Sequence, residues 1–355
     1  MEIRLKEVRK VCIMNMAYSV SVIIPTYNSE KTLEYSLKSI RQQRMNQKEI
    51  EILVIDGGST DKTLDIARQY DAAILYNEHR LPEFAKQQGM MAARGKYGIF
   101  IDSDEAFTNM DSLGNRLKLL SKYPSVKNVV STGQVCINGE NGVTRYANFI
   151  GDPFSNFVYR YNGYNRLEDL KRQYHYKDIG KGILLDLKKC RFFPLFDALG
   201  NMFEIETARK LYRQRGKDPS FAANIFSNMV EDTRQAIAMK CDFICHRAGM
   251  STQGYLSKIR WRVKNNLFAT KGVGFAQRSK RETVLQRRRL LFVPYCLLLF
   301  PVLIDAVRFS LKNKDVYFLN HFWYAEYTFC IIVWYYLLKI IHYPVKMDKM
   351  YGKEK

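Results

Sequence analysis

Two carboxylates that follow an apolar run are the part of this 355-residue sequence best suited to chemistry. Residues 99–101 are Ile-Phe-Ile and lead directly into Asp102, Ser103 and Asp104. A buried strand over the apolar residues would end there and leave both acids beyond its carboxyl end. Such oxygen ligands suit Mg²⁺ or Mn²⁺, which proteins bind through one or two carboxylates together with substrate phosphates. The pair therefore indicates a divalent-cation site, although an Asp-x-Asp on its own is a weak signal.

Strand and helix patterns alternate along the first part of the chain, which is the order of a parallel, doubly wound sheet. Right-handed crossovers in such a sheet bring the carboxyl ends of the strands to one edge. Asp56 and the segment 25–28 should therefore lie near Asp102 and Asp104. Strands are expected at residues 20–24, 50–55, 72–75 and 99–101. Helices are expected to begin at Ser29, at Ser59 or Thr60, and at Pro82. The third helix is expected to end at Gly95.

Five segments in the first third of the chain resemble the motifs of one enzyme family in their order and spacing. Residues 20–104 resemble the nucleotide-sugar half of the family 2 glycosyltransferases, which have a GT-A fold, and a fainter resemblance extends to about residue 270. One departure is Lys86-Gln87, where the family more often carries Arg-Asn. The segments are 21–30 (SVIIPTYNSE), 54–61 (VIDGGSTD), 85–89 (AKQQG), 93–97 (ARGKY) and 102–104 (DSD).

The resemblance implies a fold class, a donor and a set of binding residues. The fold is expected to be α/β of the GT-A type, a Rossmann-like and mostly parallel sheet flanked by helices. A C-terminal helical membrane-associated region is also expected, from the basic and apolar residues later in the chain. The donor would be a nucleotide sugar, expected to be a UDP-sugar, bound with Mn²⁺ or Mg²⁺. Asp104 would bind the metal with Asp102, and Asp56 would read the base. The nucleotide-binding set is Pro25, Thr26, Tyr27, Glu30, Asp56, Lys86, Asp102 and Ser103, in which the first three line the base pocket and Lys86 approaches the phosphates.

Sugar transfer to a hydroxyl also needs a base that takes the proton of the acceptor. Glu231 and Asp232 match the acidic pair that the family carries after its metal motif, so the resemblance makes Asp232 the catalytic base and Glu231 its neighbour. One base opposite the leaving group implies inversion at the anomeric carbon. We place the pair before a helical pattern over residues 236–240. The alternative is that the two acids only complement the dipole of that helix.

His246 follows a strand pattern at residues 243–245. Some relatives place a third metal or phosphate contact after this strand, whereas a lone histidine is more often structural. Cys241 and Cys245 are too far apart for the usual chelating pair, so no cysteine metal site is expected. The seven cysteines show no disulfide framework, which favours a reducing compartment.

Length and composition divide the chain into a catalytic domain and a basic, apolar appendage. Eleven Lys or Arg and one acid lie in the segment 258–289, and apolar stretches follow at 290–304 and 322–341. We expect a membrane hairpin or two interfacial helices there, with the buried helices of a soluble domain as the alternative. The expected division is 1–18 (N-terminal extension), 19–257 (GT-A domain, halves 19–125 and 126–257), 258–289 (basic juxtamembrane segment), 290–345 (membrane-associated helical hairpin) and 346–355 (basic tail).

The formal net charge of +21 bears on the partners. The charge is concentrated beside the apolar stretches, as expected at an anionic membrane, so no nucleic acid partner is expected. The first twenty residues lack the pattern of a signal peptide, and the basic flanks predict a catalytic domain on the cytoplasmic face of the cell membrane. The acceptor would then be a lipid-linked glycan, or polyprenyl phosphate itself. A basic nucleic-acid-binding protein and a non-catalytic nucleotide-binding scaffold stay open as alternatives of other classes.

Overall fold

The computed structural model describes residues 18–136, 139–159, 167–190, 193–194, 196, 200–215, 221–247, 249–268 and 288–346. Its strands are β1 (Tyr18–Thr26), β2 (Ile50–Asp56), β3 (Ala73–Tyr76), β4 (Gly95–Phe100), β5 (Glu105–Phe107), β6 (Asn128–Val130), β7 (Gln134–Val135), β8 (His175–Asp178), β9 (Gly182–Asp186), β10 (Asn201–Glu204), β11 (Gln235–Met239) and β12 (Ile244–His246). Its helices are α2 (Leu33–Arg41), α3 (Thr63–Gln69), α4 (Pro82–Ala92), α5 (Ser112–Lys122), α6 (Gly142–Ile150), α7 (Pro153–Tyr159), α8 (Leu167–Gln173), α9 (Ile205–Gln214), α10 (Ile225–Thr233), α11 (Thr252–Phe268), α14 (Arg288–Leu297), α15 (Phe300–Asn313) and α16 (His321–Ile340), with short 3-10 helices η1 (Gln47–Glu49) and η3 (Val316–Asn320).

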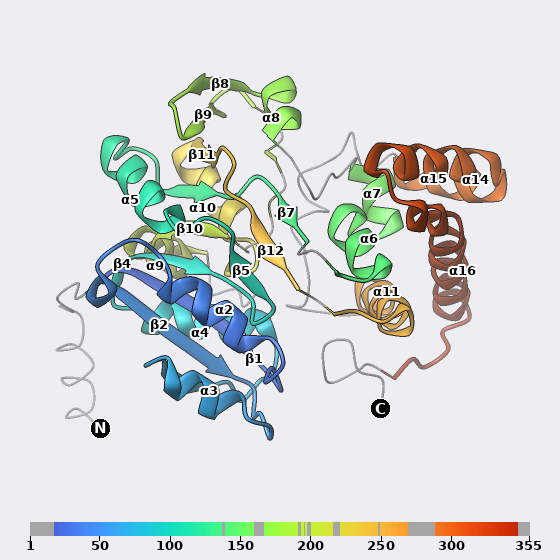
Figure 1. Cartoon of the computed structure of the whole chain (residues 1–355). Helices are drawn as coiled ribbons and strands as arrows, with labels where there is room; N and C mark the ends of the chain where they lie inside the picture. The colour runs from blue at the N-terminus through green and yellow to red at the C-terminus, as the bar shows by residue number, and fades with distance from the viewer. Residues whose placement is uncertain are drawn as a thin grey trace.

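A nine-stranded sheet forms the centre of the molecule, in the order β3-β2-β1-β4-β10-β6-β11-β9-β8 (Figure 1). The first four of these strands are parallel neighbours, as predicted, while β10 runs antiparallel between β4 and β6. A second, small sheet has the order β5-β12-β7 and follows the carboxyl end of β4 in the chain. The α/β class is therefore confirmed, and the second half of the large sheet is mixed.

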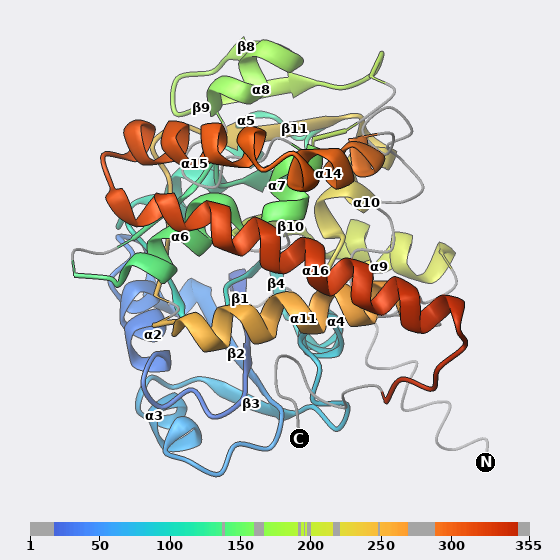
Figure 2. The ribbon, with the colours of Figure 1, turned by 90° about the vertical axis from the view of Figure 1, so that its right-hand side faces the viewer.

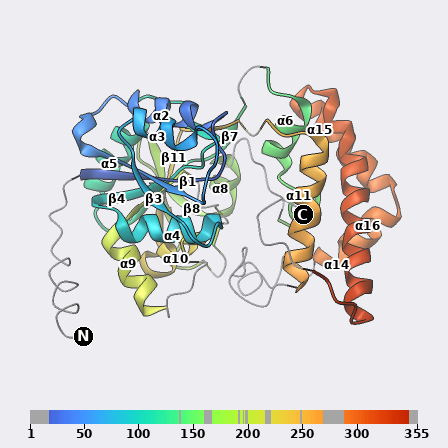
Figure 3. The ribbon, with the colours of Figure 1, turned by 90° about the horizontal axis from the view of Figure 1, so that it is seen from below.

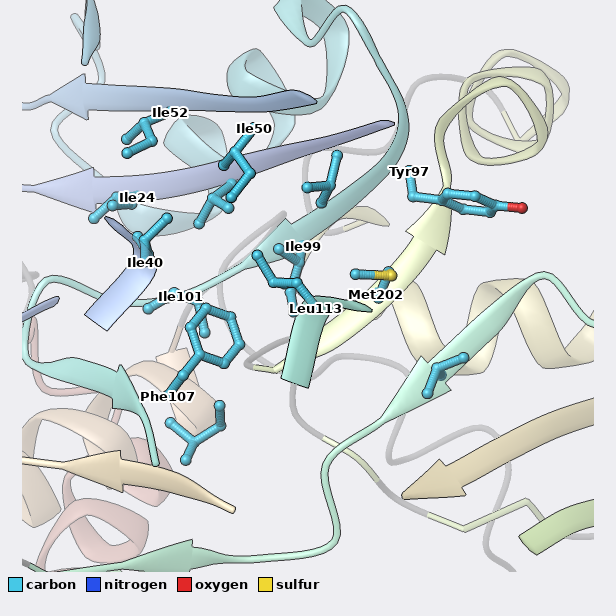
Figure 4. Close-up of a cluster of buried hydrophobic side chains, with 14 of the residues drawn as sticks. Ile24, Ile40, Ile50, Ile52, Tyr97, Ile99, Ile101, Phe107, Leu113 and Met202 are labelled. Atoms are coloured by element: carbon cyan, nitrogen blue, oxygen red, sulfur yellow. The ribbon is translucent and has the colours of Figure 1, made fainter. Parts of the chain in front are cut away.

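Two apolar clusters cover the two faces of this sheet. Side chains of β1 alternate between them: Val22 and Ile24 belong to the cluster that holds the apolar face of α2, whereas Ile23 belongs to the cluster with α4 and α9. Figure 4 shows part of the first cluster, with Ile40 of α2 and Leu113 of α5 packed over the strands. Burial on both faces explains why β1 and β2 read as continuous apolar runs in the sequence.

The first two helices begin later than predicted. The carbonyl of Ser29 accepts hydrogen bonds from the backbone of Thr32 and Leu33, so a turn precedes α2 and the helix begins at Leu33. Asp61 accepts a hydrogen bond from the backbone N–H of Thr63 at 3.0 Å, where α3 begins. Polar loop residues in both places satisfy backbone donors, and they lengthen the loops at the carboxyl end of the sheet.

Gly95 does not close α4, contrary to the prediction. The helix ends at Ala92, and Gly95 is the first residue of β4. A Cβ atom on Gly95 would lie 2.7 Å from the backbone nitrogen of Ser21, so the glycine allows β4 to approach β1 closely.

A group of helices packs on the side of the sheet where the parallel strands end (Figures 1 and 3). The helices α6 and α11 meet η3 and α16 in an aromatic cluster that contains Tyr146, Tyr255, Phe318 and Tyr324. Figure 2 shows α14, α15 and α16 outside α6 and α7. The helix α11 runs through the domain boundary that we expected between residues 257 and 258.

Several predicted segments lie wholly or partly outside the described residues. They are residues 1–17 of the N-terminal extension, residues 269–287 of the basic segment and residues 347–355 of the tail. Within the described part of the chain, no single helix combines the length and hydropathy of a membrane span. The helices α14 and α15 meet those criteria only together, and they are bent by 96° where they join.

Candidate active site

The loop after β4 carries Asp102 and Asp104, and a second strand pairing brings His246 to it. β12 pairs antiparallel with β5, which sets His246 opposite Glu105. The backbone N–H of Arg247 donates to the carbonyl of Asp104 at 2.7 Å. As a result, Nε2 of His246 lies 3.4 Å from Oδ2 of Asp104. The structure therefore brings His246 to Asp104, and the role of His246 as a metal ligand stays a prediction.

The electrostatics of this pair follow from its partial burial. Burial disfavours the charged form of Asp104, but the neighbouring His246 outweighs it and lowers the pKa of the carboxyl to about 2. Burial also disfavours the imidazolium, but Asp104 outweighs it and raises the pKa of His246. Each side chain therefore favours the charged form of the other.

Asn148 of α6 fixes the orientation of the imidazole. Its Oδ1 lies 2.5 Å from Nδ1 of His246, and its Nδ2 donates to the carbonyl of the same histidine at 3.0 Å. An amide oxygen can only accept, so Nδ1 carries a proton and Nε2 is turned toward Asp104. This support is missing from the sequence analysis, because nothing in the local sequence links Asn148 to His246.

Lys86 of α4 pairs with Asp102. The ammonium lies 3.1 Å from Oδ1 of Asp102, and the lysine side chain is almost fully buried. Burial works against the ammonium, but the charges of Asp102 and Glu105 outweigh it, so the pKa of Lys86 is raised. The lysine thus neutralises the first acid of the motif, and its approach to phosphates stays a prediction.

Glu105 is a third acid that the sequence analysis missed, although it directly follows the motif. The side chain is fully buried, and its Oε2 accepts a hydrogen bond from the backbone N–H of Asp102 at 3.2 Å. Burial, reinforced by the charge of Asp102, raises the pKa of Glu105 to about 8. Burial therefore favours the neutral form of Glu105 more than is usual for a glutamate.

Asp56 closes the loop at the end of β2. The residue is 3% exposed, and its carboxylate accepts hydrogen bonds from the backbone N–H groups of Gly58 and Ser59, both at 2.8 Å, and from the hydroxyl of Thr26 at 3.2 Å. These bonds give Asp56 a structural part in the turn. Its contact with a base stays a prediction.

The remaining predicted nucleotide-binding residues lie at the end of β1, which includes Pro25 and Thr26, and on the loop that follows it. Pro25 is buried and Tyr27 half-buried, while the exposed Glu30 accepts from the backbone N–H of Lys62 at 3.2 Å. This loop reaches the acid motif, because the hydroxyl of Ser103 lies 2.9 Å from that of Ser29. The structure therefore brings the loop after β1 to the Asp102–Asp104 loop.

Glu231 and Asp232 are not brought to this site, which corrects the prediction. They lie in the last turn of α10, and Arg234 follows with a left-handed backbone. The next residues, 235–239, form strand β11 instead of a helix, because four of the five are buried apolar residues within the sheet. β11 is parallel to β6, and β6 is parallel to β4 because both run antiparallel to β10. The start of β11 therefore lies at the opposite edge of the sheet from the carboxyl end of β4.

Side-chain contacts agree with this placement. The hydroxyl of Ser125, which precedes β6, lies 3.1 Å from Oε1 of Gln235. Glu231 pairs with Arg215 at 2.6 Å, and Asp232 is exposed. A catalytic base must reach the proton that it removes. The predicted catalytic roles of Glu231 and Asp232, and the inversion derived from them, therefore lose their support.

Arg247 is a further basic side chain that borders the site. The guanidinium of Arg247 lies 5.4 Å from the ring centre of Tyr35, a residue of α2. The side chain is exposed, and the ring holds it beside the loop of Asp104. The sequence analysis missed Arg247, although the residue directly follows His246.

The residues present fit a divalent cation that a substrate helps to hold. Among the described residues, no group of three His, Cys, Asp or Glu side chains forms a complete protein site. Mg²⁺ and Mn²⁺ bound with phosphates need only one or two protein carboxylates. Asp104 and His246 supply two ligand atoms that face each other. The imidazole nitrogen is a softer ligand than oxygen, so it favours Mn²⁺ over Mg²⁺.

Comparison with known proteins relates the N-terminal half of the chain to one family. Residues 21–183 match the family model described as Glycosyl transferase family 2. The poly(ribitol-phosphate) beta-N-acetylglucosaminyltransferase TarS of Staphylococcus aureus is 32% identical over 111 residues, which are 30% of this chain and 19% of that protein. The dolichyl N-acetyl-alpha-D-glucosaminyl phosphate 3-beta-D-2,3-diacetamido-2,3-dideoxy-beta-D-glucuronosyltransferase of Methanococcus voltae is 33% identical over 106 residues, which are 28% of this chain and 33% of that protein. The chain thus spans well under half of the length of either relative.

A solved structure matches nearly the whole chain. The mannosyltransferase PcManGT from Pyrobaculum calidifontis, in complex with GDP-Man and Mn²⁺, has a TM-score of 0.52 and 18% sequence identity, and the match covers 89% of this chain and 87% of that one. At this identity the likeness shows the fold alone. Residues 21–183 are therefore similar to glycosyl transferase family 2, and the chain has an α/β fold of the GT-A type.

Proposed function

We propose that this protein binds a nucleotide sugar together with a divalent cation and transfers the sugar to an acceptor. One observation carries the proposal. Asp104, which lies in the segment that matches the glycosyl transferase family 2 model, and His246, which is far from it in the chain, face each other at the carboxyl end of the parallel strands. Ligands of open α/β sheets bind at this edge.

The side chains around this site would have different roles in binding. Asp104 and His246 would hold the cation, and Asn148 would keep Nε2 available. A cation bound there would supply positive charge to the diphosphate of the leaving nucleotide. Lys86 offsets the charge of Asp102, so that a diphosphate meets less repulsion. Arg247, held over an aromatic ring, offers a further cation for phosphate oxygens.

We infer a UDP-sugar as donor and a lipid-linked glycan or polyprenyl phosphate as acceptor. The name of one relative describes transfer to a sugar carried on dolichyl phosphate, which supports a lipid-borne acceptor. The apolar helices beside the domain, α14 to α16, also suit an acceptor that is presented at a lipid surface.

The position of Asp232 favours a second candidate function. With this carboxylate at the opposite edge of the sheet, the acid motif can still bind a nucleotide sugar without any transfer. The two candidates differ in turnover. Only the transferase releases free nucleotide faster when a lipid-linked acceptor is added.

Calorimetric titration of UDP-glucose, UDP-N-acetylglucosamine and GDP-mannose tests the binding step. We expect at least one of them to bind in Mn²⁺, and both a chelator and Asp104→Asn to weaken that binding. Asp65→Asn, which removes an exposed acid on α3, is the matched control and should bind like wild type. Failure of all three to bind would reject the proposal. Binding without acceptor-dependent nucleotide release would select the scaffold.

A further inference from the structure

The exposed apolar surface of this protein is concentrated on α14, α15, α16 and their connections. Of the 25 large apolar side chains that are exposed in the described part of the chain, 21 lie between residues 290 and 343. A soluble monomer rarely exposes a contiguous apolar patch of this size. The three helices lie on the far side of α6 and α7 from the large sheet (Figures 2 and 3). We call them the helical layer.

The inner face of the helical layer is already occupied. Phe292, Tyr295 and Ala325 are buried there, packed with Phe154 and Phe157 of α7. The apolar residues on the outer face are therefore additional to those that attach the layer to the protein. They include Trp323, which is 68% exposed, and Trp334 on α16. This outer face needs a second apolar environment.

The junction of α14 and α15 is the most apolar part of this face. Four consecutive residues, Leu297 to Phe300, are all exposed, with Leu298 at 67% and Phe300 at 69%. The chain bends there by 96°. We call these four residues the apolar elbow. A bend lined by leucine and phenylalanine can enter the acyl region while both helices lie along the surface.

The charges around the layer identify the apolar environment as a lipid surface. Residues 288–346 contain seven Lys or Arg and three acids. Two of the acids, Asp305 and Asp315, are paired with arginines. Arg308, Lys312 and Lys314 are exposed on or just after α15, beside the apolar residues. Basic residues next to apolar ones, with Trp at the border, suit anionic headgroups above acyl chains.

We propose that the helical layer is an interfacial anchor that binds the surface of an anionic bilayer, with the apolar elbow inserted among the acyl chains of one leaflet. The inner face stays attached to α7, so the GT-A domain is held against the membrane. Lipid binding by this layer does not depend on the proposed catalytic function, and Asp104→Asn should bind vesicles like wild type.

Flotation of the full chain with vesicles tests the anchor. We expect binding to phosphatidylcholine vesicles that contain phosphatidylglycerol, and weaker binding at high salt or without the anionic lipid. The double variant Leu298→Ser/Phe300→Ser should reduce the partition on the order of tenfold, because two exposed apolar side chains no longer enter the bilayer. Met110→Ser, an exposed apolar residue outside the helical layer, is the control and should bind like wild type.

Two further experiments test the role of the basic residues near α15 and the depth at which the helical layer enters the bilayer. Arg308→Gln/Lys312→Gln/Lys314→Gln should lose the preference for anionic vesicles, whereas the control Lys48→Gln/Lys118→Gln/Lys122→Gln, on the sheet domain, should keep it. Emission of Trp323 and Trp334 should be quenched more by bromine near the carbonyl end of the acyl chains than near the methyl end. Three results would overturn the proposal: no vesicle binding by wild type, self-association through the elbow in place of binding, or strongest quenching at the bilayer centre.

Discussion

The Oδ2 atom of Asp104 lies 3.4 Å from the Nε2 atom of His246. Asp104 directly precedes β5, and His246 is the last residue of β12. The pairing of β5 with β12 sets this distance, and the backbone bond from Arg247 to Asp104 secures it. A cation held between the two side chains would need Nε2 of His246 without a proton, since a metal ligand has to be deprotonated. The proposed cation site would therefore use two side chains that already face each other.

Removal of either ligand should weaken Mn²⁺ binding. We expect His246→Gln and Asp104→Asn each to raise the dissociation constant for Mn²⁺ in the presence of nucleotide by about tenfold or more, because one of two protein ligands is lost. Electron paramagnetic resonance of free Mn²⁺ measures the change. Unaltered affinity in both variants would remove these residues as ligands.

Asn148→Ala should weaken the same site without removing a ligand. The imidazole loses the acceptor that holds its Nδ1 proton, and orienting groups of this kind are worth about 10–100-fold in metal affinity. Asn115→Ala on α5 is the control and should leave Mn²⁺ binding unchanged. Equal affinities for the two variants would show that His246 needs no support from α6.

Asp232→Asn should leave nucleotide-sugar turnover unchanged, because the carboxylate lies at the far edge of the sheet. Release of nucleotide from the donor that binds best measures this, with Asp104→Asn as the inactive reference. Loss of turnover in Asp232→Asn with normal donor binding would mean that the residue reaches the reacting atoms, and would contradict the placement seen here.

Arg116→Met should strongly destabilise the protein. The guanidinium pairs with Asp242 at 3.0 Å, and both side chains are fully buried. Its loss leaves an uncompensated buried carboxylate, which costs about 3–5 kcal/mol of the free energy of unfolding. Urea denaturation measures the change. Arg68→Met removes an exposed ion pair with Asp65 and should cost at most about 1 kcal/mol. A similar shift for both variants would contradict the argument from burial.

Asp315→Asn should destabilise the protein at neutral pH and not at low pH. Arg145 lies 2.7 Å from the carboxylate, and its hydrogen bond lowers the pKa of Asp315 below the ordinary value. A lowered folded-state pKa stabilises the fold above the pKa of the unfolded chain, and this contribution is lost as the pH falls through the folded-state pKa. The unfolding free energy from urea titration at pH 7 should be about 1 kcal/mol lower than that of wild type, and the difference should shrink as the pH falls through the folded-state pKa of Asp315. A difference that persists in acid would point to lost packing instead.

The parallel half of the sheet could be predicted from the sequence because its signals are local. Strands β1, β2 and β4 are buried on both faces and read as apolar runs, and each run stops at polar residues that form the loops of one edge. Right-handed crossovers then fix that edge. The acids Asp102 and Asp104 could be placed on it without coordinates, since they directly follow such a run.

The rest of the fold and of the candidate site depended on contacts between segments that are far apart in the chain. The acidic pair Glu231 and Asp232 resembled a helix start, and only the burial of residues 235–239 beside β6 shows that a strand begins there. The support of His246 by Asn148 comes from packing of α6 on β12. The sequence by itself determined the acid motif, the edge of the sheet on which it lies and the apolar character of the C-terminal helices. Tertiary structure alone decided which side chains face the motif. Strand pairing and helix packing bring together residues that are far apart in the chain, and the local sequence around each residue does not indicate its partner.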